Sequence, residues 1–321
     1  MRSVALAADG GPNVGLGHLG RSAALAQAFR ELGARPVFVD VPASCRFWVR
    51  SLGFDLAALS SRRWDILAAD SYRFSPQDWQ RLRRQSRNLL AFDDLGTCRA
   101  PADWILNGHV YARGLRFSAG PAAGLLLGPK FLPLRQEYWS PSLRRRISPR
   151  IRRLLITLGG GICEALTETV IKAAQQALPQ AEIHVAIGML APKPASVAAT
   201  AVVWHRGLMS LRPLLESCDA AVTAGGQTIY ELAFTGTPAA VVERGPDQKG
   251  NVLGMAEAGT VLLAGKAAAP GLAVHLRAAL RRIDRDPALR ARMSESGRGL
   301  IDGHGALRVA RLVLGQSPRR P

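Results

Sequence analysis

The stretch VALAADGGPNVGLGHLGR, residues 4–21, decides the fold. Its first five residues, Val4–Ala8, form a short apolar run that predicts a buried strand, and Asp9 ends the run. Glycines follow, and apolar residues then recur at three- and four-residue spacing over Leu19–Leu32, which predicts a helix. A strand joined to a helix by a glycine-rich loop is typical of an α/β domain that binds a polar or anionic ligand at the helix start. The glycine spacing matches neither GxGxxG nor a Walker A loop, so ATP hydrolysis is not supported.

The same alternation of short apolar runs and amphipathic stretches continues in two series, which predicts parallel sheets. The first series gives further strands over Pro36–Val41, Asp65–Asp70 and Asn88–Phe92, with helices over Ser44–Leu52 and Pro76–Gln85. The second gives strands over Leu154–Leu158, Glu182–Ile187, Ala201–Trp204, Ala220–Thr223, Ala239–Val242 and Val261–Leu263, then helices over Leu272–Ile283, Pro287–Leu300 and Ala306–Leu314.

A Pro- and Arg-rich stretch without strand character separates the two series. We therefore predict an α/β protein of two Rossmann-like domains facing a cleft, with residues 1–140 as the first domain and 141–153 as a basic linker. Residues 154–321 form the second domain. Its closing helices are expected to cover that domain, and a return of these helices to the first domain stays open.

Composition excludes several classes of protein. The chain has 321 residues, of which 48% are hydrophobic, and this excludes a disordered chain. No apolar run reaches the roughly 18 residues of a membrane span, and no signal-peptide core is visible, so we expect a cytoplasmic protein. Four cysteines without ligand spacing suggest neither a disulfide framework nor a zinc site. We expect a monomer that needs no cofactor and no metal.

The net charge of +18 comes mostly from arginines scattered along helical faces. Because RNA-binding aromatics and zinc fingers are missing from the sequence, a solvated basic surface is favoured over nucleic-acid binding. The densest basic cluster, residues 143–153, leaves weak contact with an anionic surface open.

Polar groups with possible chemistry stand at the starts of predicted helices and the ends of predicted strands. A helix N-terminus disfavours a protonated imidazole, so His18 would be a neutral ring able to accept a proton, or else a histidine that only caps its helix. The sequences DSY at 70–72 and FDD at 92–94 end two first-domain strands and should lie at the ligand edge of the sheet, although helix capping is an alternative for Asp93 and Asp94.

Two glycine-rich turns in the second series, TLGGGI at 157–162 and TAGGQTIYEL at 223–232, predict a site for a phosphate-bearing ligand. Gln227 and Thr228 add side-chain donors, and the Glu231 carboxylate suits the vicinal hydroxyls of a ribose. Such turns also occur in any α/β protein, so a purely structural role stays open.

Taken in order, these segments resemble one family along nearly the whole chain. GLGHLGR at 15–21, DSY at 70–72, FDDL at 92–95, LGPKFLPLRQE at 127–137, AGGQT at 224–228 and GTP at 236–238 resemble the pseudaminic acid pathway hydrolases called PseG, or SpsG in spore-coat operons. This family is distantly similar to MurG. The resemblance implies the GT-B type of fold and a hydrolase that removes UDP from UDP-2,4-diacetamido-2,4,6-trideoxy-β-L-altropyranose.

The resemblance also implies roles for individual residues. His18 would activate the attacking water, and Tyr72 would line the same pocket. Substrate-binding positions would be Asp9, Gly17, Arg21, Gln248 and Asn251. Nucleotide-binding positions would be Gly160, Gly225, Gly226, Gln227, Thr228 and Glu231. The chain departs from the family at Gly161-Ile162, where Ser or Thr then Asp is usual, and at Ala7, where Arg is frequent. A GT-B glycosyltransferase with a UDP-sugar donor is the alternative function.

Overall fold

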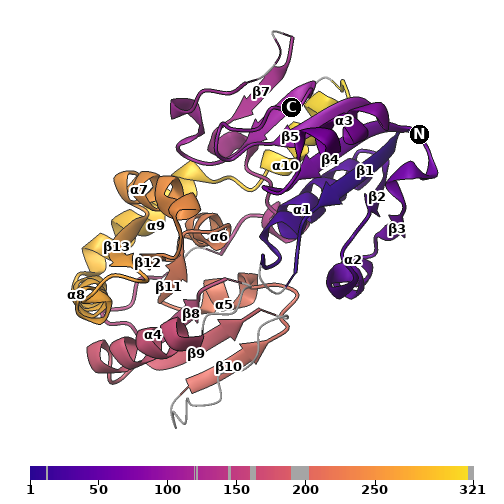
Figure 1. The fold of residues 1–321 in the computed structure, drawn as a ribbon. Coiled ribbons are helices and arrows are strands. Elements are labelled where there is room, and N and C mark those ends of the chain that lie inside the picture. The colour runs from indigo at the N-terminus through magenta and orange to yellow at the C-terminus, as the bar shows by residue number, and fades with distance from the viewer. Residues whose placement is uncertain are drawn as a thin grey trace. The chain divides into compact units, whose positions relative to one another are not determined.

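The computed structural model describes residues 1–11, 14–118, 120, 122–143, 146–159, 164–188 and 202–316 (Figure 1). The chain forms two compact units. Unit 1 comprises Met1–Ser140 together with Gly303–Pro321, and unit 2 comprises Pro141–Asp302. Each unit is built on its own sheet, so the prediction of an α/β protein with two sheets is confirmed.

Unit 1 contains a seven-stranded sheet with the strand order β3-β2-β1-β4-β5-β6-β7. Its strands are β1 (Ser3–Ala8), β2 (Arg35–Val39), β3 (Asp55–Ala57), β4 (Trp64–Asp70), β5 (Ser86–Phe92), β6 (Trp104–Asn107) and β7 (Gly124–Leu127), all paired in parallel. Its α-helices are α1 (Gly17–Glu31), α2 (Arg46–Ser51), α3 (Pro76–Arg84) and α10 (Gly305–Val313). Strands β3, β6 and β7 are not among the predicted strands, because runs of three or four residues are too short to show a period.

The strand order reverses between β1 and β4, which lie side by side. Chain connections leave this point in opposite directions, and ligands of open parallel sheets bind beyond the strand ends there. Residues 4–8 of β1 are buried, as the apolar run predicts for a strand covered on both faces. The glycine loop within residues 4–21 therefore lies at the switch point of unit 1.

The C-terminal helix belongs to unit 1, so the assignment of residues 154–321 to one domain is wrong. Helix α10 packs on α1. A Cβ added at Gly305 would lie 2.1 Å from the Leu132 carbonyl oxygen, and Arg308 Nη1 donates to the Lys130 carbonyl oxygen at 3.0 Å. The chain thus returns to the unit in which it began.

Unit 2 contains a six-stranded parallel sheet with the order β10-β9-β8-β11-β12-β13. Its strands are β8 (Arg153–Thr157), β9 (Glu182–Ile187), β10 (Val202–Arg206), β11 (Ala220–Ala224), β12 (Ala239–Glu243) and β13 (Val261–Lys266). Its α-helices are α4 (Glu164–Ala177), α5 (Arg212–Ser217), α6 (Thr228–Thr235), α7 (Lys249–Glu257), α8 (Leu272–Arg285) and α9 (Pro287–Leu300). All six predicted strands of the second series correspond to these strands, although residue 201 lies outside the described residues.

The predicted linker packs on unit 2 instead of standing apart. The backbone N–H groups of Arg152 and Arg153 donate to Asp219 Oδ2 at 2.8 and 2.9 Å, and the Ile151 N–H donates to Asp284 Oδ1 at 2.9 Å. These carboxylates, one before β11 and one on α8, hold the described part of the segment against unit 2. None of the described helices is long and apolar enough to cross a membrane.

Candidate functional site

Six polar side chains of unit 1 form a connected group at the switch point, which we call the His18 cluster. His18 and Arg21 lie three residues apart on α1, so they share one face of that helix. Asp70 is the last residue of β4, and Asp94 follows the end of β5. The members are His18, Arg21, Asp70, Tyr72, Asp94 and His109.

Asp70 links the two side chains of α1. Its Oδ1 lies 2.7 Å from His18 Nδ1, and it accepts from Arg21 Nη2 at 2.6 Å, while Oδ2 accepts from Arg21 Nε at 2.5 Å. The Asp70 side chain is 1% exposed and that of His18 is 11% exposed. The imidazole is therefore held by a fully buried carboxylate that is itself fixed by a two-pronged guanidinium contact.

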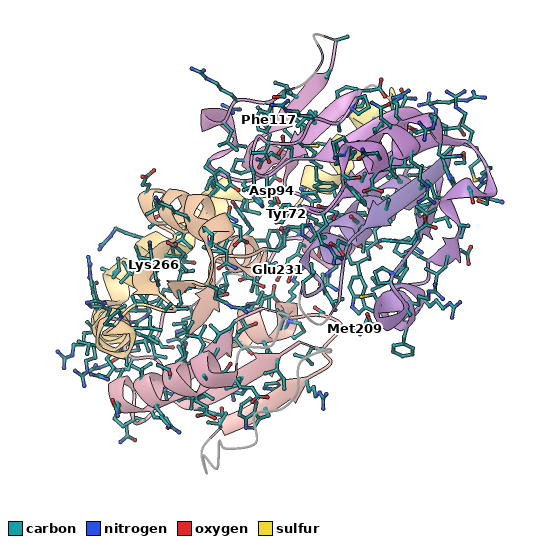
Figure 2. The ribbon with its side chains drawn as sticks, in the orientation of Figure 1. Tyr72, Asp94, Phe117, Met209, Glu231 and Lys266 are labelled. Carbon is teal, nitrogen blue, oxygen red and sulfur yellow. The ribbon has the colours of Figure 1, made fainter. Side chains whose placement is uncertain are left out.

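Asp94 extends the cluster on the other side of Arg21. Its Oδ2 receives Arg21 Nη1 at 2.7 Å and the Tyr72 hydroxyl at 2.5 Å, and Figure 2 shows Tyr72 beside Asp94. His109 Nδ1 lies 3.4 Å from Asp94 Oδ1. The His18 and Tyr72 rings meet edge to face, with centroids 4.7 Å apart. Arg21 thus joins the carboxylate that holds His18 to the carboxylate that holds Tyr72.

The electrostatics of the cluster keep both carboxylates charged. Burial by itself would raise the pKa of Asp70, but Arg21 and His18 bring it below its usual value. The pKa of Asp94 also lies well below its usual value, because Arg21 and His109 outweigh burial. Burial of the hydroxyl and the Asp94 charge raise the pKa of Tyr72, so this phenol stays protonated. Burial lowers the pKa of His109, which favours its neutral form.

The contact with Asp70 assigns the tautomer of neutral His18. Arg21 Nη2 also lies 3.2 Å from Nδ1, but the carboxylate oxygen is closer, at 2.7 Å, and accepts a proton only from a protonated Nδ1. Nε2 then carries the lone pair that can accept a proton. The helix N-terminus alone predicts a neutral His18 ring that can accept a proton, and the structure adds a buried carboxylate behind that ring.

Two of the residues predicted to bind substrate in unit 1 lie outside the cluster. Asp9 is buried and accepts bonds from the Arg73 side chain, from the Ser71 hydroxyl at 3.2 Å and from the Gly10 N–H at 2.8 Å. Gly17 begins α1, and a Cβ added there would meet no atom within 4 Å. The third, Arg21, binds Asp70 and Asp94, and its contact with a substrate stays a prediction.

The glycine turn of unit 2 follows β11 and leads into α6. A Cβ at Gly225 would lie 2.4 Å from Val252 Cγ2, so only glycine fits there. Gln248 Oε1 accepts from the Gly225 N–H at 3.0 Å, and Asn251 Nδ2 donates to the Gly225 carbonyl oxygen at 3.1 Å. Gln248 and Asn251 therefore support the backbone of this turn, and their contact with a sugar stays a prediction.

The other predicted nucleotide-binding residues surround the same turn. A Cβ at Gly226 would meet no atom within 4 Å, Gln227 precedes α6, and Thr228 is its first residue. Glu231 lies one turn further on and is 8% exposed (Figure 2). Gly160 and the departure at 161–162 lie outside the described residues.

The sequence predicted the ligand edge of the sheet, but it did not predict which residues contact His18. The strand-end rule placed Asp70 and Asp94 at that edge, but not in contact with His18, Arg21 or Tyr72. His109 stands in no motif with recognisable spacing, so nothing in the sequence pointed to it. Among the described parts of the chain, no three His, Cys, Asp or Glu side chains are grouped to hold a metal ion.

Two curated proteins resemble the chain in sequence, while no family model matches it. The spore coat polysaccharide biosynthesis protein SpsG of Bacillus subtilis is 23% identical over 339 residues, covering 97% of each chain. The Helicobacter pylori pseudaminic acid cytidylyltransferase and UDP-2,4-diacetamido-2,4,6-trideoxy-β-L-altropyranose hydrolase is 26% identical over 183 residues, covering 56% of this chain and 34% of that protein.

Solved structures resemble the chain over almost its full length. The glycotransferase of kitacinnamycin superposes with a TM-score of 0.67 at 19% identity, covering 99% of each chain. MurG of Acinetobacter baumannii gives 0.65 at 12% identity, covering 98% of this chain and 99% of that one. The chain is therefore similar in sequence to SpsG and to the H. pylori hydrolase, and it has the two-sheet GT-B type of fold that these solved structures share.

Proposed function

We propose that this protein is a nucleotide-sugar hydrolase that releases UDP from a UDP-linked diacetamido-trideoxy sugar in the biosynthesis of a nonulosonate or another surface polysaccharide. The observation that carries the proposal is the contact of His18 Nδ1 with the buried Asp70 carboxylate at 2.7 Å. A carboxylate that holds one ring nitrogen in its protonated form leaves the other nitrogen as a general base. The H. pylori relative, whose name includes a UDP-sugar hydrolase, supports the choice of substrate.

In the proposed reaction, water attacks the anomeric carbon and gives a proton to His18 Nε2. The bond between that carbon and the diphosphate oxygen breaks, and its electron pair leaves with UDP. Two carboxylates and one guanidinium give the His18 cluster a single negative charge while both histidines are neutral. Proton uptake by His18 brings the cluster to neutrality, so these buried charges stabilise the imidazolium that forms.

Unit 2 would bind the nucleotide. Helix α6 begins at Thr228, two residues after Gly226, so the positive end of its dipole lies beside the glycine turn. The developing charge of the diphosphate would be met by this helix end and by the Thr228 hydroxyl. Glu231 would accept the ribose hydroxyls. Because the Gln248 amide oxygen and the Asn251 amide group already bind the Gly225 backbone, the turn is preorganised for its ligand.

A glycosyltransferase is the second candidate, and the solved structures favour it. The kitacinnamycin protein, which shares the fold, is a glycotransferase. In a transferase the hydroxyl group of an acceptor would take the place of water, and His18 would accept its proton in the same way. The base and the nucleotide site would then be shared, and only the acceptor would differ.

The deciding experiment measures UDP released from a panel of UDP-sugars without and with glycan or lipid acceptors. Release without an acceptor that falls about 10²- to 10⁴-fold in His18→Gln supports the hydrolase. His275→Gln changes an exposed histidine of α8 and serves as the matched control, with release unchanged. Release that requires an acceptor would favour the transferase. Full activity of His18→Gln would remove the base assignment.

A further inference from the structure

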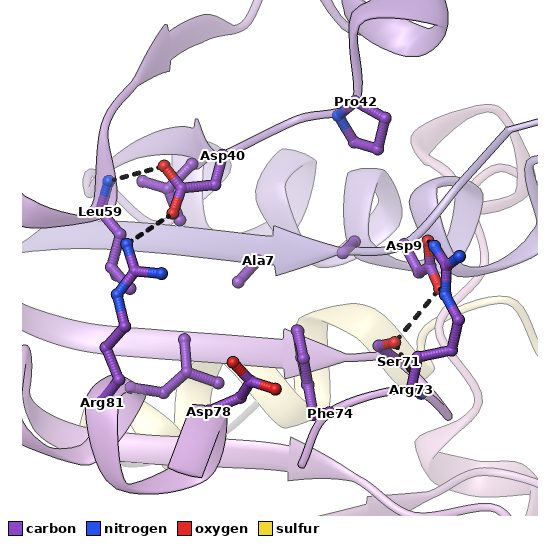
Figure 3. A pocket seen from close by; sticks show the side chains of 13 residues that line it. Ala7, Asp9, Asp40, Pro42, Leu59, Ser71, Arg73, Phe74, Asp78 and Arg81 are labelled. Carbon is purple, nitrogen blue, oxygen red and sulfur yellow. Dashed lines mark hydrogen bonds and ion pairs between the residues drawn. The ribbon is translucent and has the colours of Figure 1, made fainter.

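A cavity of about 290 Å³ opens in unit 1 beside α3. Figure 3 shows the side chains that line it. Its walls come from the ends of β1 and β2, the segment after β4 and the first turns of α3. Both β1 and β4 border the switch point of the sheet, where parallel α/β folds bind ligands. The volume lies near the lower end of the roughly 300–1,000 Å³ range of ligand pockets, so it suits a monosaccharide-sized molecule.

This cavity lies on the opposite face of the sheet from the His18 cluster. Ala7 and Ala69 belong to the apolar core that packs under Trp79 and Leu82 of α3. Successive side chains of a strand point to opposite faces, so Asp70 points away from α3, toward α1. The proposed hydrolysis at His18 uses no residue on the α3 side of the switch point, where the resemblance alone implied a substrate contact for Asp9.

Two ion pairs stand at opposite ends of the cavity (Figure 3). At one end, Arg73 Nε donates to Asp9 Oδ2 at 2.6 Å, and the Ser71 hydroxyl donates to the same oxygen at 3.2 Å. At the other end, Arg81 Nη2 donates to Asp40 Oδ2 at 3.2 Å. The Arg73 and Arg81 side chains are 68% and 55% exposed. Each end thus offers accessible N–H donors next to a carboxylate acceptor.

The charge of the lining favours an uncharged ligand. Asp9, Asp40 and Asp78 contribute three carboxylates, against the two guanidinium groups of Arg73 and Arg81. The lining is therefore not positive, which disfavours an anion such as phosphate. A cation is disfavoured too, because Asp9 and Asp40 are each paired with arginine and Asp78 Oδ2 accepts from the Ser75 N–H and hydroxyl at 2.8 and 2.7 Å.

The floor between the two ends is apolar. Ala7, Val39, Leu59, Phe74 and Leu82 line it, and all of them pack in or against the core beneath α3. A pyranose ring combines an apolar C–H face with hydroxyl groups that both donate and accept hydrogen bonds. Its C–H face matches this floor, and its hydroxyls match the donor and acceptor pairs at the two ends.

We propose that this cavity is a second ligand site that binds a neutral, polyhydroxylated sugar ring independently of His18. The Arg73–Asp9 pair and the Arg81–Asp40 pair bind hydroxyl groups at opposite sides of the ring. The site goes beyond the proposed hydrolysis and does not depend on it.

Binding of methyl α-D-glucoside and N-acetylglucosamine to the full-length protein tests this site, with inorganic phosphate as the charged probe. Ligand-observed NMR gives the Kd of each probe for the wild type and for Arg81→Ala and Arg73→Lys. Arg81→Ala removes a charge-assisted donor, and Arg73→Lys removes the planar donor group that can make two parallel bonds. For each variant, the Kd of the sugar that binds should therefore rise about tenfold.

Two controls separate this site from other surfaces. Arg83 lies on the same helix but pairs with Asp103 outside the cavity, so Arg83→Ala should leave the Kd unchanged. His18→Gln should also leave it unchanged, because the His18 cluster faces the other way. Binding of neither sugar, preferential binding of phosphate, or sugar binding that Arg81→Ala and Arg73→Lys do not weaken would each overturn the proposal.

Discussion

Replacing Asp70 by Asn tests how the His18 ring is held. The substitution keeps the shape of the side chain but removes the negative charge that contacts His18 Nδ1 at 2.7 Å and receives two N–H groups of Arg21 at 2.5 and 2.6 Å. An amide in this place also turns an N–H₂ group toward one of these donors. We expect a loss of stability and a larger loss of activity.

The stability cost follows from burial. Asp70 is 1% exposed, and removing one partner of a buried ion pair costs about 3–5 kcal/mol. Arg21 keeps its contact with Asp94 at 2.7 Å, so we expect about 3 kcal/mol, at the lower end of that range. A domain is stable by about 5–15 kcal/mol, so the variant should still fold. Asp103→Asn, at a partly exposed ion pair, is the control and should cost less than about 1 kcal/mol in the same urea unfolding experiment.

The chemical consequence can be measured with and without a substrate. Because Asp70 fixes the tautomer, release of UDP by Asp70→Asn should fall about 10²- to 10⁴-fold, as for loss of a general base. The ¹⁵N chemical shifts of neutral His18 report the tautomer directly. We expect protonated Nδ1 in the wild type and a larger share of protonated Nε2 in the variant. Protonated Nε2 in the wild type, or unchanged turnover of the variant, would show that Asp70 does not fix the tautomer of a catalytic base.

Three further outcomes follow from the same geometry. Tyr72→Phe removes the hydroxyl that donates to Asp94 at 2.5 Å, so UDP release should fall while the unfolding free energy, measured in urea, changes by about 1 kcal/mol. Gly226→Ala adds a methyl group in open space, so Tm without ligand should stay unchanged. The same substitution should abolish the rise in Tm that UDP causes. Gly299→Ala, which also adds a methyl group in open space, is the control and should keep that rise. The folded-state pKa values of Asp70 and Asp94 lie below the unfolded value of about 3.9, so their stabilisation is complete above that pH and is lost as the pH falls through the folded values. The unfolding free energy should therefore fall below about pH 4, and less steeply in Asp94→Asn, when urea unfolding is repeated across that range.

The pattern of apolar runs in the sequence was enough to predict the two sheets. The apolar runs at Val4–Ala8 and Leu154–Leu158 correspond to β1 and β8, because a strand buried on both faces shows a continuous apolar run. The amphipathic run at Ala306–Leu314 was also correctly predicted as a helix. Its place in unit 1 was not, because the apolar face of a helix does not specify which core covers it. That choice depends on the close packing of Gly305 against Leu132.

The candidate site shows the same division between local and long-range information. The glycine loop and helix start identified His18, and the strand-end rule identified Asp70. The bond between them depends on the pairing of β1 with β4 and on the rotation of α1, which local patterns do not encode. Gln248 was expected at the sugar from its resemblance to a family segment, yet its amide oxygen binds the Gly225 and Arg244 backbone N–H groups. Such a supporting role becomes visible only when two loops are placed together.

In the proposed reaction, water attacks the anomeric carbon with His18 as the base. Reaction of a UDP-sugar that the protein turns over in ¹⁸O-labelled water, followed by mass spectrometry of both products, tests it most directly. We predict one ¹⁸O atom on the C1 hydroxyl of the sugar and none on the phosphates of UDP, with the rate of labelling reduced about 10²- to 10⁴-fold in His18→Gln. Label on a UDP phosphate, or no UDP release until an acceptor is added, would contradict the claim.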